Sequence, residues 1–170
     1  MGKLLTLALL FILMACQSES DSPLKSIKLK TPQGDIIKTR IVYSNQDMER
    51  GLSGTKSNDF DEEEGMLFFY LYDSEKYFWM PDTYFDLDLI YLDAELKVLD
   101  IERKLTHHIG RENETEIPRA RVVWSRHVLE MKSSSPIAAK IKVGDKLEWI
   151  SKLGLKETHK EIESILNQKN

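Results

Sequence analysis

The chain has 170 residues, in which 24 lysines and arginines stand against 28 aspartates and glutamates, so its formal charge is −4. A mildly acidic chain with both signs interspersed has no basic patch for nucleic acid, and we expect no nucleic-acid partner. The single cysteine, Cys16, excludes an internal disulfide.

The first 15 residues have the pattern of an export signal. Lys3 supplies a positive start, and residues 4–14 form an almost unbroken apolar run without charge. The run is shorter than the roughly 20 residues of a transmembrane helix, but it has the length of a signal-peptide core. It ends in Leu13-Met14-Ala15-Cys16, which resembles the lipobox of bacterial lipoproteins. We therefore predict lipidation of Cys16 and cleavage in front of it.

A lipid anchor sets the expected organisation of the mature chain. Residues 1–15 are the predicted signal peptide, and residues 16–25 are the lipidated cysteine and a polar tether. Acyl chains on Cys16 attach a protein to a membrane surface without spanning it. We expect a location in the cell envelope, at the periplasmic face of the outer membrane rather than at the inner membrane.

Residues 26–152 are predicted to form one β domain, because alternating apolar and polar residues recur between turn signals. The first hairpin joins residues 27–31 to 36–43, and a short helix is expected near residues 45–51. Further strands are predicted at 65–72, 76–80, 87–92, 97–105, 121–124 and 128–131. This spacing of short strands favours a jelly-roll-like antiparallel sandwich or barrel.

The end of the chain carries two local signals. Gly144-Asp145 predicts a tight hairpin between residues 141–143 and 146–150. Residues 153–170 form a predicted helical tail. Within it, Thr158 and Glu161 make a capping box, and three apolar residues fall on one face: Ile162, Ile165 and Leu166. That face is expected to dock on the domain itself, or else to receive a partner.

Six short motifs then occur in order along the chain. They are Arg50-Gly51-Leu52, Gly65-Met66-Leu67-Phe68, Phe78-Trp79-Met80 with Thr83, Leu87-Asp88 with Leu92-Asp93, Val128-Leu129-Glu130 and Gly144-Asp145. Together they resemble the domain-of-unknown-function 192 family, small and often exported domains of bacteria and archaea. The resemblance covers about residues 36–150. It implies a mostly β domain and brings no established activity.

The sequence departs from the family pattern at several positions. The family usually has Met at position 53, Lys-Asn at 81–82 and Pro at 86, where this chain has Ser53, Pro81-Asp82 and Asp86. The segment after Asp93 carries His107 and His108 in place of the prolines and the cysteine that are frequent there. Ligand chemistry that uses those positions does not transfer to this chain.

Four residues form the predicted ligand-binding set. Asp88 and Glu130 lie within apolar strand segments, where a buried carboxylate without a partner is costly. They therefore face solvent, pair with a cation such as Arg50, or line a ligand cleft. Trp79 precedes a strand break and either packs in the core or walls a pocket. Our hypothesis is that Arg50, Trp79, Asp88 and Glu130 border one pocket.

Other candidate sites have simpler interpretations. From a loop, His107 and His108 could reach a metal with Glu102, Glu112 or Glu114, but a solvated polar loop is the better interpretation. His127 and Glu130 should face opposite sides of a strand. The acidic run 59–64 lacks the alternation and central glycine of a calcium loop. Residues 133–135 lack a nucleophile setting. We predict no catalytic residue, no metal and no cofactor.

Three functions remain to be compared. The first is a lipid-anchored module that binds a small polar ligand, such as a sugar or an envelope fragment. The second is an envelope assembly protein with an apolar surface for a partner. The third is a hydrolase that uses Asp88 and Glu130 as a carboxylate pair, roughly 5–9.5 Å apart across a cleft. The sequence favours binding over catalysis.

Overall fold

A computed structural model of the protein describes residues 24–168. The predicted signal peptide, Cys16 and most of the tether lie outside the described residues. The strands are β1 (Ser26–Lys30), β2 (Ile36–Val42), β3 (Glu64–Phe68), β4 (Ser74–Lys76), β5 (Leu87–Leu92), β6 (Val98–Leu105), β7 (Val123–Ser125), β8 (His127–Lys132) and β9 (Glu148–Ile150). The α-helices are α1 (Asn45–Arg50) and α2 (Leu155–Asn167), and short 3₁₀ turns occupy Ser57–Asp59 and Ala138–Lys140.

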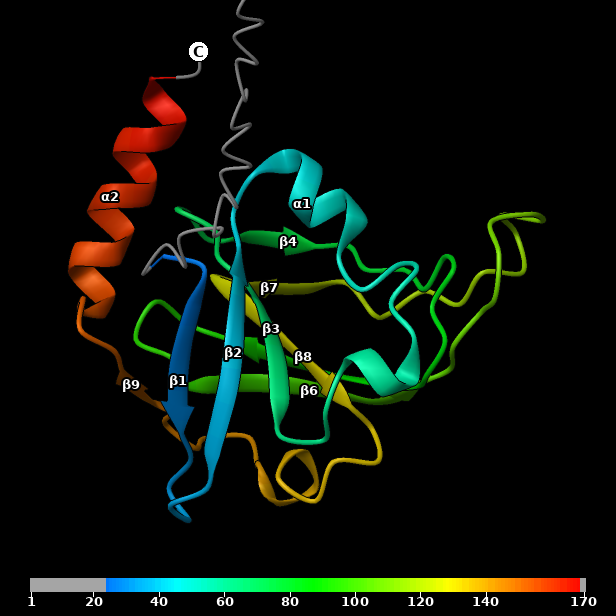
Figure 1. Ribbon diagram of the computed structural model, residues 1–170, viewed down its shortest axis with the longest axis horizontal. Helices are drawn as coiled ribbons and strands as arrows, with labels where there is room; N and C mark the ends of the chain where they lie inside the picture. Colours follow the sequence, from blue (N-terminus) through cyan, green and yellow to red (C-terminus); the bar gives the residue numbers. More distant parts are fainter. Residues whose placement is uncertain (1–23, 169–170) are drawn as a thin grey trace, which may run out of the picture.

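Seven strands form one curled sheet in the order β6-β5-β8-β3-β2-β1-β9, and β4 pairs with β7 in a separate ribbon (Figure 1). The two edges of the large sheet meet. Lys97 at the start of β6 bridges Lys146 just before β9, and backbone hydrogen bonds join Val98 to Asp145 and Leu147 to Leu96. The sheet therefore closes on itself, and the mainly β prediction with a short and a C-terminal helix is confirmed.

One strand pair differs from the antiparallel expectation. β2 and β3 run parallel, with Arg40 opposite Met66. A parallel pair needs a crossover connection that returns the chain to the same end of the sheet. The 21 residues between Val42 and Glu64, which contain α1, supply that crossover.

The sheet separates two hydrophobic cores. The inner core receives side chains from β1, β2, β3, β5, β6 and β8, for example Leu29, Ile37, Leu67 and Leu129. The outer core is built on one face of β3, β5 and β8, and it is covered by the segment 52–85. Because neighbouring residues of a strand point to opposite faces, a residue on β8 belongs to one core or the other.

Two local predictions are corrected at the C-terminal end. Residues 141–143 form no strand, because the backbone of 144–147 pairs with 96–98 and leaves no partner for a hairpin. Helix α2 begins three residues before the expected cap, with Gly154 as N-cap, and Thr158 is buried inside it. The packing of Leu155 on the inner core explains the earlier start.

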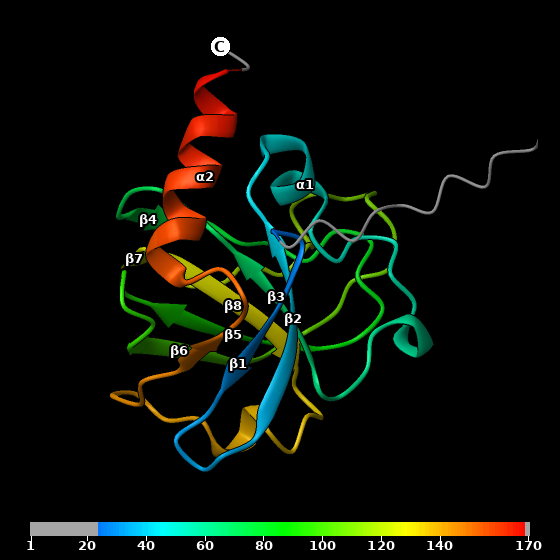
Figure 2. The same cartoon turned by 60° about the vertical axis from the view of Figure 1, so that its left-hand side comes forward.

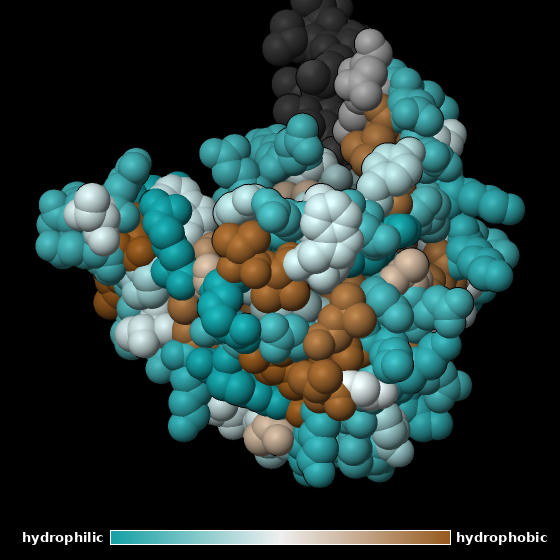
Figure 3. Space-filling view, turned by 180° about the vertical axis from the view of Figure 1, so that it is seen from behind, coloured by the Kyte–Doolittle hydropathy of each residue, from teal (hydrophilic) through white to brown (hydrophobic). Residues whose placement is uncertain are grey.

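Helix α2 docks on its own domain. Ile162 is fully buried, and Ile165 and Leu166 pack against the inner core. Figure 2 shows α2 following β9 and standing along the side of the molecule. Between residues 24 and 168 there is no helix long and apolar enough to cross a bilayer. Seen from behind, hydrophobic side chains reach the surface near the middle of the molecule (Figure 3).

Candidate functional site

The two carboxyl groups of the predicted site lie on neighbouring strands but on opposite faces of the sheet. In the ladder between β5 and β8, Asp88 stands opposite Met131 of the inner core, and Glu130 stands opposite Leu89 of the outer core. The two groups cannot flank one ligand. Asp88 therefore does not belong to the predicted four-residue pocket. The predicted Asp88–Glu130 hydrolase pair is wrong for the same reason.

Asp88 is held by a complete set of polar partners. Its Oδ2 accepts a hydrogen bond from Arg103 Nη1 at 2.5 Å. Its Oδ1 accepts from the Lys104 backbone N–H at 2.9 Å and from Ser133 Oγ at 2.8 Å. Arg103 also donates to the carbonyls of Ala138 and Ile141. A buried charge with this number of partners is a structural element that joins β5 and β6 to the turn at 138–141.

Glu130 lines a cavity of about 320 Å³ on the outer face of the sheet. Together with Leu87 of β5, Glu130 of β8 faces residues from α1 and the turn after it, from the end of β3, and from the segment after β4. The lining residues are Asn45, Met48, Glu49, Arg50, Gly51, Leu52, Ser53, Phe68, Tyr70, Tyr77, Phe78, Trp79, Met80, Pro81, Thr83, Leu87 and Glu130. We call this space the Glu130 cavity.

The Glu130 carboxyl has no ion-pair or hydrogen-bond partner within residues 24–168, although the residue is only 5% exposed. Burial disfavours the charged form and raises the pKa of Glu130 to about 8. The carboxyl is therefore mostly protonated at neutral pH in the empty cavity. Its remaining exposure is toward the cavity that it lines. A buried polar group that faces a cavity without a partner is a candidate for ligand contact.

Aromatic rings form the walls of the Glu130 cavity. Phe68 and Phe78 meet edge to face at 4.8 Å between ring centroids. The Tyr70 ring has the ammonium of Lys76 against it at 3.9 Å, and the Trp79 ring has the Arg119 guanidinium at 5.2 Å. Burial raises the pKa of Tyr70 to about 12, so its hydroxyl remains neutral.

The rim of the cavity is fixed by the turn that follows α1. Gly51 has a φ of +49°, which favours glycine, and a Cβ added there would lie 3.1 Å from Phe68 Cζ. Ser53 Oγ donates to the Pro81 carbonyl at 2.6 Å, which ties this turn to the segment after Trp79. Arg50 lies on the rim and reaches Asp47 at 3.8 Å. The predicted pairing of Arg50 with Asp88 or Glu130 is therefore wrong.

The comparison with known proteins places the chain in a family. A family model described as Uncharacterized ACR matches residues 28–149, most of the described chain. The chain belongs to the domain-of-unknown-function 192 (DUF192) family. No protein with a curated description matches the sequence.

Two crystal structures resemble this DUF192 domain. A proposed transcription regulator from Sinorhizobium meliloti 1021 has 21% identity and a TM-score of 0.57, over 73% of this chain and 92% of that one. A protein of unknown function from Novosphingobium aromaticivorans has 22% identity and a TM-score of 0.58, over 73% of this chain and 84% of that one. At this level of identity the likeness concerns the fold alone.

Five of the six DUF192 motifs named above contribute to the lining of the Glu130 cavity, and Gly144-Asp145 does not. Arg50-Gly51-Leu52, Phe78-Trp79-Met80 and Thr83 contribute every one of their residues to its lining, and three further motifs contribute Phe68, Leu87 and Glu130. These segments are far apart in the sequence. The fold brings them together around the Glu130 carboxyl.

Of the four predicted site residues of this DUF192 domain, three line one cavity: Arg50, Trp79 and Glu130. Their role in ligand binding remains a prediction. Four lining aromatics were missing from the predicted set: Phe68, Tyr70, Tyr77 and Phe78. The signal that could have found Tyr70 is its position two residues after Phe68, at the end of a strand whose alternate residues face the outer core.

The other titratable groups have structural partners. His127 faces the inner core, on the opposite side of the sheet from Glu130 as predicted. Its ring lies tilted against that of Phe69 with 4.4 Å between the centroids, and it accepts a hydrogen bond from the Tyr70 N–H at 3.3 Å. Burial, with smaller effects from Arg126 and His159, lowers the pKa of His127 to about 3. His127 also lines a groove of about 980 Å³ under α2.

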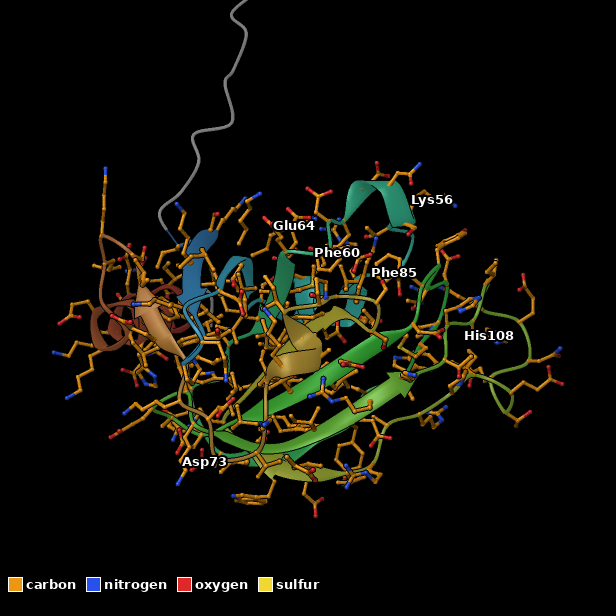
Figure 4. All side chains as sticks on the ribbon, turned by 90° about the horizontal axis from the view of Figure 1, so that it is seen from below. Lys56, Phe60, Glu64, Asp73, Phe85 and His108 are labelled. Atoms are coloured by element: carbon orange, nitrogen blue, oxygen red, sulfur yellow. The ribbon has the colours of Figure 1, made fainter. Side chains whose placement is uncertain are left out.

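The loop at 107–108 is held by Asp86. His107 contacts Asp86 Oδ1 through its backbone N–H and through Nδ1, at 2.9 and 2.7 Å. Within residues 24–168 no three His, Cys, Asp or Glu side chains are grouped to hold an ion. Figure 4 shows His108 on an outlying loop, away from Phe60 and Phe85 and from Asp73 at another edge.

Proposed function

We propose that this protein is a lipid-anchored envelope protein whose β domain binds a small polar ligand, a sugar or an envelope fragment, in the Glu130 cavity. The observation that carries the proposal is the Glu130 carboxyl, which is almost fully buried, unpartnered and lines the cavity. The remainder of the lining combines aromatic side chains with polar groups, and convergent polar groups beside aromatic rings are typical of small-molecule sites.

The size and polarity of the cavity support a small ligand. A volume of about 320 Å³ is at the lower end of known ligand pockets, which run from roughly 300 to 1,000 Å³. One carboxyl on the floor and a few polar groups at the rim can orient a ligand, while the aromatic walls exclude water from it. These features favour a ligand of one ring or a short fragment.

Binding is a better interpretation than hydrolysis. The second carboxyl among the lining residues is Glu49, which is exposed on α1. Asp88 lies on the other face of the sheet. A glycosidase mechanism needs two carboxyl groups on opposite sides of one bond, and Glu130 has no such buried partner.

The anchoring part of the proposal rests on the sequence. The apolar leader and the Leu-Met-Ala-Cys segment that ends at Cys16 support export and lipidation. Leu24, the first described residue, packs in the inner core two residues before β1. A tether of about eight residues after Cys16 would therefore hold the domain close to the membrane surface.

Binding is tested with the full chain in non-ionic detergent. Native mass spectrometry reveals any molecule that copurifies, and the shift of the melting temperature is then measured against monosaccharides and envelope fragments. We expect a stabilising ligand whose effect is lost in Glu130→Gln and Trp79→Ala. The matched controls are Glu63→Gln and Trp124→Ala, which change an exposed carboxyl and an exposed tryptophan outside the cavity. Equal loss in the controls would contradict the proposal.

A second candidate function is envelope assembly. Tyr72, Tyr77 and Trp124 are 65–70% exposed and lie on or next to the β4–β7 ribbon. Exposed aromatic side chains of this kind are frequent in protein interfaces. If no ligand in the panel shifts the melting temperature, and if Trp124→Ala but not Glu130→Gln impairs the cell envelope, assembly is the better assignment.

A further inference from the structure

The Glu130 cavity lacks a positive charge near its floor. Among the lining residues, Arg50 is the one cation, and its side chain is 73% exposed and directed to Asp47. Glu130 itself touches apolar neighbours across the ladder, Met66 on β3 and Leu89 on β5. An ionised carboxylate at this position therefore needs a counter-charge that the described protein does not provide.

The walls are suited to a cation. Aromatic faces attract ammonium and guanidinium groups, and the attraction is strongest where water is excluded. Two lining rings hold a cation of the protein itself, and among the described residues Phe68, Tyr77 and Phe78 are the lining rings that hold none. Tyr70 holds the ammonium of Lys76 at 3.9 Å, and Trp79 holds the guanidinium of Arg119 at 5.2 Å.

We propose that the ligand of the Glu130 cavity presents a protonated primary amine to the Glu130 carboxylate. This inference rests on the proposed binding function and specifies the group that is recognised. A primary ammonium has three N–H donors, so it can donate to both carboxylate oxygens while its charge meets the aromatic walls. The amine can belong to an amino sugar or to an alkylamine such as a lysine-like side chain.

Proton release provides a distinctive signature. The empty cavity holds Glu130 mostly protonated at pH 7, whereas an ammonium ligand requires the carboxylate. Binding must then release close to one proton, and the apparent affinity rises about tenfold per pH unit until pH passes about 8. The other titratable groups that line the cavity are Glu49, Arg50, Tyr70 and Tyr77, and Lys76 lies behind Tyr70. Burial lowers the pKa of Lys76 to about 8, so this group titrates in the same range.

The experiment compares matched amines and alcohols by calorimetry on the full chain in non-ionic detergent. Butylamine is paired with 1-butanol, and glucosamine with glucose and N-acetylglucosamine, at pH 7 and in two buffers of different ionisation enthalpy. The pH profile from 6 to 9 uses butylamine, because an alkylamine stays protonated throughout. We expect each amine to bind about tenfold to hundredfold more tightly than its neutral counterpart, with release of about one proton.

Glu130→Gln separates this carboxyl from Lys76. The variant should bind butylamine at least about tenfold more weakly and lose the pH dependence, while neutral ligands change little. Lys76 still titrates in the variant, so a pH dependence that survives would overturn the inference. Glu63→Gln is the control for net charge. The proton count uses the natural chain alone, and therefore it stands even if the variant folds poorly.

The outcomes distinguish the two proposals. If neutral sugars bind as tightly as the corresponding amines, and if this binding depends on Glu130, the amine inference is overturned and the binding function stands. Binding of butylamine but not of glucosamine would assign the cavity to alkylamines. Binding of glucosamine but not of butylamine would assign it to amino sugars. Absence of binding by every amine and every neutral compound would overturn both proposals.

Discussion

Asp88 and Glu130 are two buried carboxyl residues on adjacent strands, and they differ in what surrounds them. Asp88 faces the inner core and has Arg103, Ser133 and a backbone N–H as partners. Glu130 faces the outer core and has a cavity in place of partners. The comparison shows that burial of a carboxyl does not by itself mark a functional site. Glu130, which lacks such partners among the described residues and lines a cavity, is the better candidate of the two.

The largest effect is expected from Asp88→Ala. The change removes the carboxylate that accepts three hydrogen bonds, and it leaves Arg103, whose side chain is 36% exposed, with two carbonyl acceptors, so we expect a loss of about 3 kcal/mol. Urea unfolding at pH 7 measures the loss. Asp86→Ala, which removes an exposed carboxylate just before β5, is the control. A loss below about 1 kcal/mol would show that Asp88 is not the structural member of the pair.

Glu130→Gln should have an effect that depends on pH. The folded-state pKa of about 8 lies above the unfolded value of about 4.5, so the natural protein loses unfolding free energy as pH rises between these values. We expect the variant to match the natural protein at pH 4 and to exceed it by the order of 3 kcal/mol at pH 9. Urea unfolding at both pH values checks this. An equal difference at both would contradict the assignment of the titration to Glu130.

His127→Gln tests a titratable group on the inner face of the sheet, where the pH dependence of stability should have the opposite sign. The folded-state pKa of about 3 lies below the unfolded value of 6.5, so stability is lost as pH falls through this interval. Gln can still accept from the Tyr70 N–H but cannot take up the proton. When the pH is lowered from 7 to 4, the free energy of unfolding of the variant should rise by the order of 2 kcal/mol relative to that of the natural protein. Thermal melts at the two pH values measure the gain, and no change in the difference would refute it.

The smallest effect is expected at the rim. Gly51→Ala adds a methyl group at a positive φ and 3.1 Å from the Phe68 ring, and it should cost about 1 kcal/mol or more. Gly144→Ala is a matched control, because Gly144 has a φ of +93° and no atom within 4 Å of the added carbon. The difference between their melting temperatures isolates the contact with the cavity wall. A larger loss in Gly144→Ala would show that the Phe68 contact costs nothing.

The sequence predicts the fold where the signals are local. Alternating residues identify most strands, and Ser44 and Gly51 identify the ends of α1. Pairings over long separations are not visible in this way. Leu147 looks like part of a local hairpin, but its N–H bonds to Leu96, which lies about fifty residues earlier in the chain.

The candidate site was predictable in part for the same reason. A carboxylate in an apolar strand signals either a partner or a cavity, and Asp88 and Glu130 gave the same signal. The two carboxyl groups differ because Arg103 on β6 pairs with Asp88. That contact depends on the pairing of β5 with β6 and on a β-bulge near Leu87, which local sequence patterns do not reveal. The family motifs were the better guide, because they had already joined Trp79 to Glu130.

The closure of the sheet has a consequence for the order of events during synthesis. The strand made last, β9, pairs with the strand made first, β1, through Leu29 and Trp149. Contacts between residues so far apart in sequence form slowly, since a long loop must be closed before they are gained. A nascent chain cannot complete this sheet before residue 150 has left the ribosome. The pairing that closes the sheet therefore forms only at the end of synthesis.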